Sequence, residues 1–387
     1  MSKLIYHIFA FLGWQYKDTP GVSIVYPVAT LAGTIIGVGL FSLPYAASKV
    51  GLPLMLGWFG VLGVLVILVH IFYGEVALKT PDYKRFPGFA EHYFGKKGKT
   101  IALITTIGGL LGAILAYIII GGEFLTQIFQ PTYGRGELFY TSIYFLLGAA
   151  LIFFGIKAIA KIEFWGLVVF LIILLGIFIR GLPFFKLTNL FPKPQPSFIF
   201  LPYGLILFSC WGAALVPEVE EMLGKEKKLL GKVIVASLLL AMGIYLFFTI
   251  IILGITGQKT TPSALPGLKS FLGDGVVTLT LFFGLLTTFT SFISLGLTLK
   301  RVLSFDLGFS EFKAWLITCF VPFFLYFLGM KNFISLISFL GGVFLGTDGI
   351  LMLLMYRKIK PKKAKLVWLL SLIFIGGIIY EIIYTLG

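Results

Sequence analysis

Two apolar stretches of this 387-residue chain are interrupted in the middle by glycine and polar residues. The first interruption runs AGTIIGVGLFSLPY from Ala32 to Tyr45, and the second runs FSCWGAALVPE from Phe208 to Glu218. Glycine lowers helix propensity by about 1 kcal/mol relative to alanine, so both stretches are predicted to be broken helices. A broken helix presents free N–H groups from one half and free C=O groups from the other. Such ends can bind the two charges of an α-amino acid zwitterion.

The same glycines allow a second interpretation, which is helix packing. Gly33 and Gly37 form a small-xxx-small pair, and Gly108, Gly109 and Gly112 form another possible contact face. If each glycine is considered by itself, helix packing is the favoured explanation over a binding site. The matched pair of breaks favours a binding site, because interrupted helices at corresponding positions are the best sequence indication of a transporter site.

Three hydroxyl side chains in a later apolar stretch share one helix face. Thr287, Thr290 and Ser291 are spaced at i, i+3 and i+4. With carbonyl groups of the first break, they could complete an oxygen cage for a sodium ion. The alternative is that these hydroxyls bond back to carbonyls of their own helix, as most membrane serines and threonines do. Both interpretations stay open from the residues alone.

Other polar side chains within apolar stretches are candidates for substrate or proton contacts. Tyr117 lies in the middle of its stretch and either offers its hydroxyl to a substrate carboxylate or fills space. Glu123 and Asp348 lie deepest among the acids, and an ionisable side chain within a bilayer is usually functional. The acids between Glu218 and Glu221 lie beside basic residues near a helix end, which favours a gate or salt bridges over proton carriage.

Cysteine and histidine usage argues against metal chemistry. Cys210 and Cys319 both fall in apolar stretches, and His7, His70 and His92 are isolated, so neither a disulfide framework nor a zinc site is expected. No paired acids, histidine cluster or nucleophile-base set falls in one register, so we do not expect an enzyme. No cofactor is expected beyond a coupling ion.

Composition indicates the elements that position these residues. Apolar residues make up 58% of the chain, charged residues 12%, and the mean hydropathy is +1.02. Apolar runs of roughly 20 residues, long enough to cross about 30 Å of hydrocarbon, follow one another along the chain. Runs such as Ile101 to Ile120 are apolar all round, which favours helices over a β-barrel. The predicted fold class is therefore an all-α polytopic membrane protein.

We predict eleven membrane spans. The longest loops between them have only about 20 residues, so no soluble domain is expected. The predicted spans are Val22–Lys49, Leu52–Leu78, Thr100–Phe129, Leu138–Ile156, Ile162–Leu182, Phe200–Leu223, Val233–Gly257, Val276–Leu299, Ala314–Gly329, Phe333–Tyr356 and Val367–Tyr384.

Basic residues predict the orientation in the cell membrane. With the N-terminus inside, 23 of the 31 Lys and Arg residues fall on the cytoplasmic side, and the C-terminus lies outside. The net charge of +15 comes from residues that flank spans, so we expect the lipid bilayer rather than nucleic acid as the partner. No obligate protein partner is inferred. The apolar run from Leu4 to Trp14 is short for a span and is predicted to be an interfacial helix.

The two breaks also predict an internal repeat. Gly37 and Trp211 are 174 residues apart, with five spans in each interval. An odd number of crossings inverts the second copy, which gives a 5+5 inverted repeat. We therefore predict a single transporter domain over residues 1–387, with repeat 1 at about 22–182, repeat 2 at about 200–356 and an eleventh helix at about 367–384.

The run from Ala32 to Tyr45 resembles the first-helix signature of the amino acid/auxin permease family and its bacterial aromatic amino acid permease relatives. These belong to the amino acid-polyamine-organocation superfamily, which has the LeuT-like fold. The similarity covers nearly the whole chain. Its other segments are Tyr117–Gly122, Gly155–Ile162, Pro217–Glu221, Thr290–Phe292 and Asp306–Gly308.

The resemblance implies ion-coupled uptake of amino acids by alternating access, with the substrate held between the two breaks. It implies substrate carboxylate and amine contacts at Gly33, Thr34, Gly37, Val38 and Gly39. It implies a side-chain pocket walled by Phe208, Ser209, Cys210, Trp211 and Gly212. It implies a sodium site formed by the carbonyls of Gly33 and Ile36 with Thr287, Thr290 and Ser291.

A second sodium site of this fold needs a side-chain oxygen where this chain has Leu40. At most one sodium is therefore expected, and proton coupling stays open. The predicted function is symport of neutral or aromatic L-amino acids, with the aromatic preference resting on Phe208 and Trp211. The alternative is a non-transporting amino acid sensor or partner-binding protein on the same scaffold. A sensor of this kind usually requires a long tail, and we do not predict one from this sequence. This favours the transporter.

Overall fold

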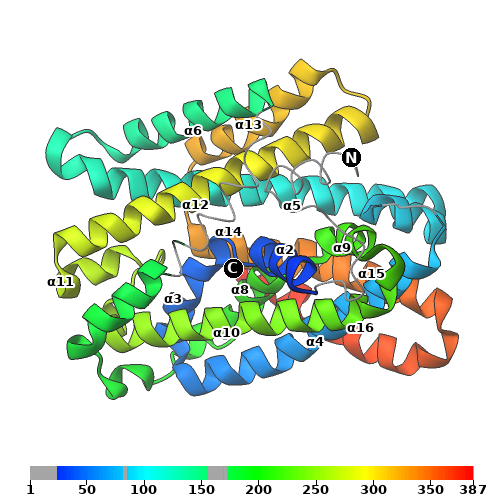
Figure 1. The fold of residues 1–387 in the computed structure, drawn as a ribbon, viewed down its shortest axis with the longest axis horizontal. Coiled ribbons are helices and arrows are strands. Elements are labelled where there is room, and N and C mark those ends of the chain that lie inside the picture. Colours follow the sequence, from blue (N-terminus) through cyan, green and yellow to red (C-terminus); the bar gives the residue numbers. More distant parts are fainter. Residues whose placement is uncertain (1–23, 82–84, 156–168, 170–171, 387) are drawn as a thin grey trace.

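The computed structural model describes residues 24–81, 85–155, 169 and 172–386, and these residues form a bundle of helices without strands (Figure 1). The predicted interfacial helix from Leu4 to Trp14 and most of the segment from Gly155 to Ile162 lie outside the described residues. Within the described residues, seven helices are long and apolar enough to cross a membrane, or eight if a bent first pair is one span. The all-α polytopic prediction is confirmed.

Apart from the fifth, each predicted span matches a helix or an interrupted helix in the described part of the chain. The lower count of seven or eight arises because one apolar run, Pro196–Lys259, contains both the sixth and the seventh predicted span. In addition, α13 has only 17 residues, and only Ile172–Phe184 of the fifth span is described. The eleven-span topology therefore stays a prediction.

The matching helices are α2 (Val25–Ile35), α3 (Leu43–Val50), α4 (Leu52–Lys79), α5 (Phe86–Tyr133), α6 (Glu137–Phe154), α8 (Leu201–Cys210), α9 (Val216–Leu223), α10 (Leu230–Thr256), α12 (Asp274–Arg301), α13 (Glu311–Phe327), α14 (Phe333–Phe339), α15 (Gly346–Ile359) and α16 (Ala364–Leu386). A short helix, α11 (Lys269–Leu272), precedes α12.

The start of the third span differs from the prediction, because α5 extends into the expected loop. It begins at Phe86, where Pro87 suits the first turn since its missing N–H would have no helical partner. The chain then kinks at Gly95, whose φ is 66°. An ion pair of 2.9 Å joins Lys99 Nζ to Glu91 Oε2 across the kink. These polar residues hid the helix, because the prediction followed apolar runs.

The tenth span contains a feature that the sequence did not indicate. α14 and α15 are joined by a π-helical turn, Leu340–Leu345, which adds a residue to the local hydrogen-bond ring. A Cβ added to Gly341 would overlap the carbonyl oxygen of Gly204 in α8. The π-turn therefore lies directly against the backbone of the first half of the sixth span.

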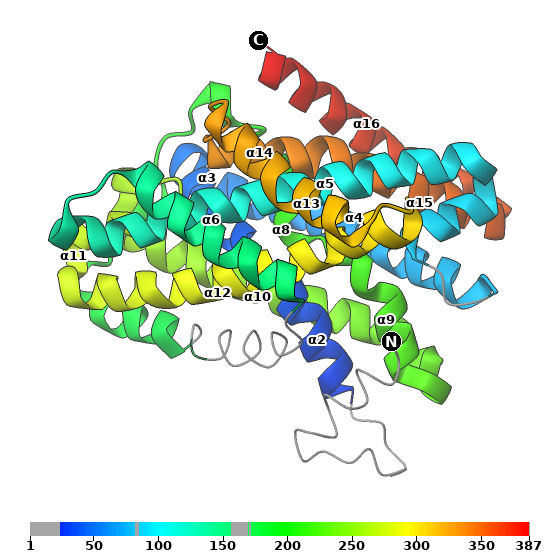
Figure 2. The same ribbon diagram turned by 90° about the horizontal axis from the view of Figure 1, so that it is seen from above.

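The helices form two layers around the interrupted pairs (Figures 1 and 2). α5 runs the length of the bundle and packs against α12, α6 and α13. On the other side, α10 packs against α2, α3 and α4. The two interrupted helices lie between these layers, and α16 lies at one edge beside α14 and α15 (Figure 2). The scaffold thus encloses both breaks.

Close packing of α5 on α6 gives a testable prediction. A Cβ on Gly121 would overlap the buried ring of Tyr144, so Gly121→Ala should lower the free energy of unfolding by about 1–3 kcal/mol. Gly109, on the same helix, has nothing within 4 Å of its Cβ position, so Gly109→Ala is the matched control. Thermal unfolding of the purified protein in detergent measures both. Equal stability of the two variants would contradict the packing.

Candidate functional site

The first interrupted helix consists of α2, an unwound segment and α3. α2 ends at Ile35, and Gly37 has an extended backbone with φ −125° and ψ −156°. A 3₁₀ turn, Val38–Ser42, then leads into α3. The two halves are bent by 49°. The first predicted break is therefore present, and it centres on the predicted glycine run.

The second interrupted helix has the same form. α8 ends at Cys210, and the backbones of Trp211 and Gly212 are not helical. A 3₁₀ turn, Ala213–Leu215, leads into α9, which has Pro217 in its first turn. The predicted pair of broken helices is confirmed.

Glycine residues bring the two breaks into direct contact. A Cβ on Gly39 would lie 2.9 Å from Ser209 Cα, and a Cβ on Gly212 would lie 2.6 Å from Ile35 Cγ1. Both distances are too short for real side chains, so any larger residue would push the breaks apart. The packing interpretation therefore holds for these two glycines, and it holds at the centre of the candidate site.

Tyr245 of α10 ties the two breaks together. Its hydroxyl oxygen lies 2.6 Å from the carbonyl oxygen of Ile35 and 2.7 Å from that of Ser209. Both carbonyls belong to the last turn of a half-helix, where carbonyls lack partners within the helix. The side chain is fully buried, and its single proton can be donated to only one carbonyl at a time. Tyr245 therefore bridges the ends of α2 and α8.

His70 of α4 supports the second break from another side. Its Nε2 accepts the N–H of Gly212 at 3.0 Å, and its Nδ1 lies 2.8 Å from the carbonyl oxygen of Val66. Only a neutral imidazole with its proton on Nδ1 makes both bonds. The ring of Trp211 packs edge-on against the imidazole, with 5.2 Å between centroids. This histidine fixes the break at Gly212.

Sequence reasoning missed both His70 and Tyr245 as site residues. His70 was considered only as a metal ligand, and the described residues contain no group of three or more metal-ligating side chains. The available signal was its position as an ionisable residue in the middle of an apolar span. Tyr245 gave no such signal, because tyrosine is common in the apolar spans of this chain.

A cavity of about 30 Å³ lies between the first break, α5 and α12. Tyr117 Oη of α5 accepts the N–H of Val38 at 3.2 Å, and a Cβ on Gly37 would lie 2.8 Å from the same oxygen. The volume holds about one water molecule or one ion and is too small for an amino acid. The residues that line the cavity are Ile36, Gly37, Val38, Leu40, Phe41, Tyr117, Thr287, Thr288 and Ser291.

Two members of the predicted hydroxyl cage reach this cavity. Thr287 and Ser291 line it together with Ile36, whereas Thr290 does not. Thr287 donates to the carbonyl of Gly284 at 3.0 Å, and Thr290 donates to the carbonyl of Thr287 at 3.0 Å. Back-bonding therefore occurs, as the alternative interpretation expected. It uses the hydroxyl protons and leaves oxygen lone pairs, which are the groups that a cation binds.

The other predicted residues lie around the cavity rather than on it. Gly33 and Thr34 lie at the end of α2, where Thr34 is exposed and donates to the carbonyl of Thr30 at 3.0 Å. Ser209 is buried and donates to the carbonyl of Leu205 at 2.7 Å. The predicted residues outside the lining are Gly33, Thr34, Gly39, Phe208, Ser209, Cys210, Trp211, Gly212 and Thr290.

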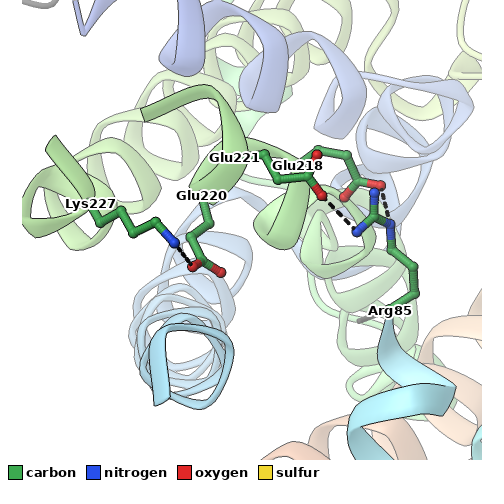
Figure 3. A network of polar contacts seen from close by, with 5 residues as sticks. All are labelled: Arg85, Glu218, Glu220, Glu221 and Lys227. Carbon is green, nitrogen blue, oxygen red and sulfur yellow. Dashed lines mark hydrogen bonds and ion pairs between the residues drawn. The ribbon is translucent and has the colours of Figure 1, made fainter. Parts of the chain in front are cut away.

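Ion pairs connect α9 to the start of α5 (Figure 3). Arg85 Nε lies 2.7 Å from Glu218 Oε1, and Arg85 Nη1 lies 3.2 Å from Glu221 Oε1. Lys227 Nζ lies 2.7 Å from Glu220 Oε1, and this pair lies on the other side of α9 from Arg85 (Figure 3). These acids therefore form the salt bridges that the sequence favoured. The pairs of Glu218 and Glu221 with Arg85 connect the second half of the sixth span to the start of the scaffold helix α5, whereas the pair of Glu220 with Lys227 is local to the end of α9.

Two transporters are similar to this chain in sequence. Tyrosine-specific transport system 1 of Haemophilus influenzae is 24% identical over 338 residues, which cover 81% of this chain and 82% of that protein. Vacuolar amino acid transporter 2 of Saccharomyces cerevisiae is 26% identical over 206 residues, 46% of this chain and 40% of that protein.

Solved structures show the same fold at low sequence identity. The inward-facing conformation of Mhp1 has a TM-score of 0.67 at 15% identity, covering 84% of this chain and 76% of that one. MhsT in complex with L-phenylalanine has a TM-score of 0.65 at 15% identity, covering 96% and 99%. The LeuT-like fold expected from the first-helix signature is confirmed.

The match to a family covers nearly all of the described chain. Residues 21–384 match the tryptophan/tyrosine permease family, a span that includes both breaks, the cavity and all but the last two residues of α16. The family and the relatives above are transporters, so the chain is not an enzyme. The resemblance to aromatic amino acid permeases is therefore confirmed, and this multi-pass membrane protein belongs to the tryptophan/tyrosine permease family.

Proposed function

We propose that the protein is an ion-coupled symporter of aromatic or neutral L-amino acids in the cell membrane, with its N-terminus inside and its C-terminus outside. The observation that carries this proposal is the contact between two broken helices beside the cavity that Tyr117 lines. Broken half-helices supply backbone donors and acceptors within the membrane, where a zwitterion otherwise finds no partner. For an amino acid to cross the membrane, the two broken helices must move apart to admit it and come together again after it leaves.

The size of the cavity supports alternating access. At about 30 Å³ it cannot hold a tyrosine or a tryptophan, so in this proposal the site must widen before a substrate binds. Substrate entry then requires movement of the first break relative to α5 and α12, which line the cavity with it. The ion pairs of Arg85 with Glu218 and Glu221 connect α9 to α5 and serve as a cytoplasmic latch in this proposal.

Aromatic neighbours of the cavity support an aromatic substrate. Phe41 lines the cavity, and its ring lies edge-on to Phe124 at 5.2 Å and to Phe248 at 6.1 Å between centroids. An aromatic substrate ring that enters beside Phe41 can form a contact of the same edge-to-face kind. The Haemophilus relative is described as tyrosine-specific, and the MhsT structure contains L-phenylalanine.

The first test is uptake by the purified protein in liposomes, with labelled aromatic, small neutral and cationic amino acids. Each is supplied under a sodium gradient, a proton gradient or neither. We expect gradient-driven accumulation of aromatic amino acids, and a loss of at least about tenfold in Gly37→Val because its side chain would collide with Tyr117. Gly60→Val is the control, since Gly60 is exposed with nothing within 4 Å of its Cβ position. Binding without uptake would favour the sensor alternative instead.

The coupling ion is the second prediction. We propose sodium at the carbonyl of Ile36 with the hydroxyl oxygens of Thr287 and Ser291, since hard oxygen ligands at a cavity of this size suit a small cation. Thr287→Ala combined with Ser291→Ala should raise the half-saturating sodium concentration at least about tenfold, or about 1.4 kcal/mol. Thr298→Ala is the matched control, because Thr298 is an exposed, back-bonded residue of the same helix. Proton-driven uptake unaffected by the double change would move the coupling site to a buried acid.

Removal of the bridge between the breaks is the third prediction. Tyr245→Phe keeps the ring and removes the hydroxyl that bonds to Ile35 or Ser209, so one buried carbonyl loses its donor at a cost of about 1–3 kcal/mol. We expect a lower thermal unfolding temperature and weaker binding of tyrosine. Tyr73→Phe removes an equally buried hydroxyl that has no hydrogen-bond partner in the described residues. If both variants behave alike, the bridge has no role.

A further inference from the structure

α16 contains a buried acid that the proposed transport site does not use. The side chain of Glu381 is fully buried. Its Oε1 accepts the hydroxyl proton of Ser338 in α14 at 2.7 Å. Its other oxygen, Oε2, has no hydrogen-bond partner among the described residues. A carboxyl oxygen without a partner in an apolar interior is costly, and it requires an explanation.

Glycines place this carboxyl at a contact of three segments. A Cβ on Gly204 of α8 would lie 2.7 Å from Glu381 Oε1, and a Cβ on Gly342 of the π-turn would overlap the Glu381 side chain. Gly377, one turn earlier on α16, faces the ring of Tyr203 from α8 in the same way. The hydroxyl of Tyr203 is buried and also without a partner among the described residues. The carboxyl and this hydroxyl are therefore enclosed between α8, α16 and the π-turn.

Among the described residues, no basic side chain forms an ion pair with the carboxyl, and Lys49 of α3 lies instead over the ring of Tyr45, 5.0 Å from its centroid. α8, α14 and the π-turn contain no Lys, Arg, Asp or Glu, and Lys365 lies at the opposite end of α16, about 24 Å away along the helix. On α15, Asp348 is bonded instead to Thr105 of α5.

The other titratable groups near Glu381 are tyrosines. They are Tyr203 of α8, Tyr380 and Tyr384 of α16, and Tyr45 of α3 beside Tyr384. Acids elsewhere do have cationic partners, as Glu218 and Glu221 have Arg85. An unpaired carboxylate enclosed in this way is strongly disfavoured relative to the neutral acid.

We propose that Glu381 is a proton-binding site, and that loss of its proton requires α8 and α16 to move apart. While α16 is packed against α8, water cannot reach an ionised Glu381 carboxylate, so the carboxyl keeps its proton. When the two helices separate, water can solvate the carboxylate and the proton can leave. The effect extends to the candidate site, since α8 is the first half of the sixth span and its Ser209 carbonyl is bonded to Tyr245. Proton binding at the eleventh helix thus biases the position of one half of the second break.

The test compares the wild type with Glu381→Gln, which keeps the shape and stays neutral at every pH. The first readout is the thermal unfolding temperature in detergent between about pH 6 and about pH 9. Under this proposal the carboxyl is protonated in the folded state, so its contribution to stability is present at low pH and is lost as pH rises. We expect the unfolding temperature of the wild type to fall with rising pH by several degrees more than that of Glu381→Gln.

The second readout is uptake in liposomes. It rests on the proposed function, whereas the unfolding measurement needs no substrate and tests the proton site by itself. We expect uptake by the wild type to fall about fivefold or more over this pH range, and uptake by Glu381→Gln to change by less than about twofold. Glu91→Gln is the control, because Glu91 is exposed and paired with Lys99, and it should keep the wild-type profile. Glu381→Gln with wild-type pH profiles in both readouts would overturn the proposal.

A second variant covers the case in which Glu381→Gln does not fold. Ser338→Ala removes the hydroxyl that donates to the carboxyl and so destabilises its ionised form further. The midpoint of the pH dependence of unfolding should move to higher pH than in the wild type. Ser335→Ala changes a partly buried serine of the same helix that is not bonded to Glu381, and it should leave the midpoint unchanged. A midpoint that does not move in Ser338→Ala would also overturn the proposal.

Discussion

The constraint on which the rest of the structure depends is that backbone N–H and C=O groups within a membrane must have partners. Two helices of this protein break in the middle of their spans, and each break frees such groups. Side chains from three surrounding helices supply the partners, namely Tyr117 of α5, Tyr245 of α10 and His70 of α4. The scaffold helices therefore do more than enclose the breaks, because they hold the unwound segments in one conformation through single hydrogen bonds.

This arrangement links the two breaks mechanically. Gly39 touches Ser209 and Gly212 touches Ile35 without room for a side chain, while Tyr245 bonds to a carbonyl of each half-helix. A shift of either break must therefore strain the other or exchange the tyrosine proton between carbonyls. Each of these bonds contributes only about 1 kcal/mol net, so a bound substrate can compensate for losing them. The hydrogen bonds and glycine contacts can therefore hold the two breaks together and still allow them to separate when a substrate binds.

The sequence predicted the elements that depend on local composition. The breaks at Gly37 and Trp211, the apolar spans and the hydroxyl face of Thr287 and Ser291 all follow from residues adjacent in the chain. It did not predict the bridge of Tyr245 to Ile35, because the two residues are 210 positions apart. A tyrosine in an apolar span also gives no signal of its own, since this chain has many. The π-turn Leu340–Leu345 was missed because no particular residue types mark the change from i+4 to i+5 hydrogen bonding.

The placement of acids separates two kinds of electrostatic contact. At the end of the sixth span, Glu218 and Glu220 pair with Arg85 and Lys227, whose side chains are partly exposed, so water weakens each pair even though Glu220 itself is buried. Glu123, Asp348 and Glu381 instead each bond to one hydroxyl of another segment, Ser263, Thr105 and Ser338 respectively. A hydroxyl donates to an ionised acid and accepts from a neutral one, so such a contact survives a change of protonation that would break an ion pair. The hydroxyl contact of each buried acid can therefore persist in both protonation states, which for Glu381 is the contact of α16 with α14. The cost of burying charge instead acts on the rest of the enclosure, which for Glu381 is the packing of α16 on α8.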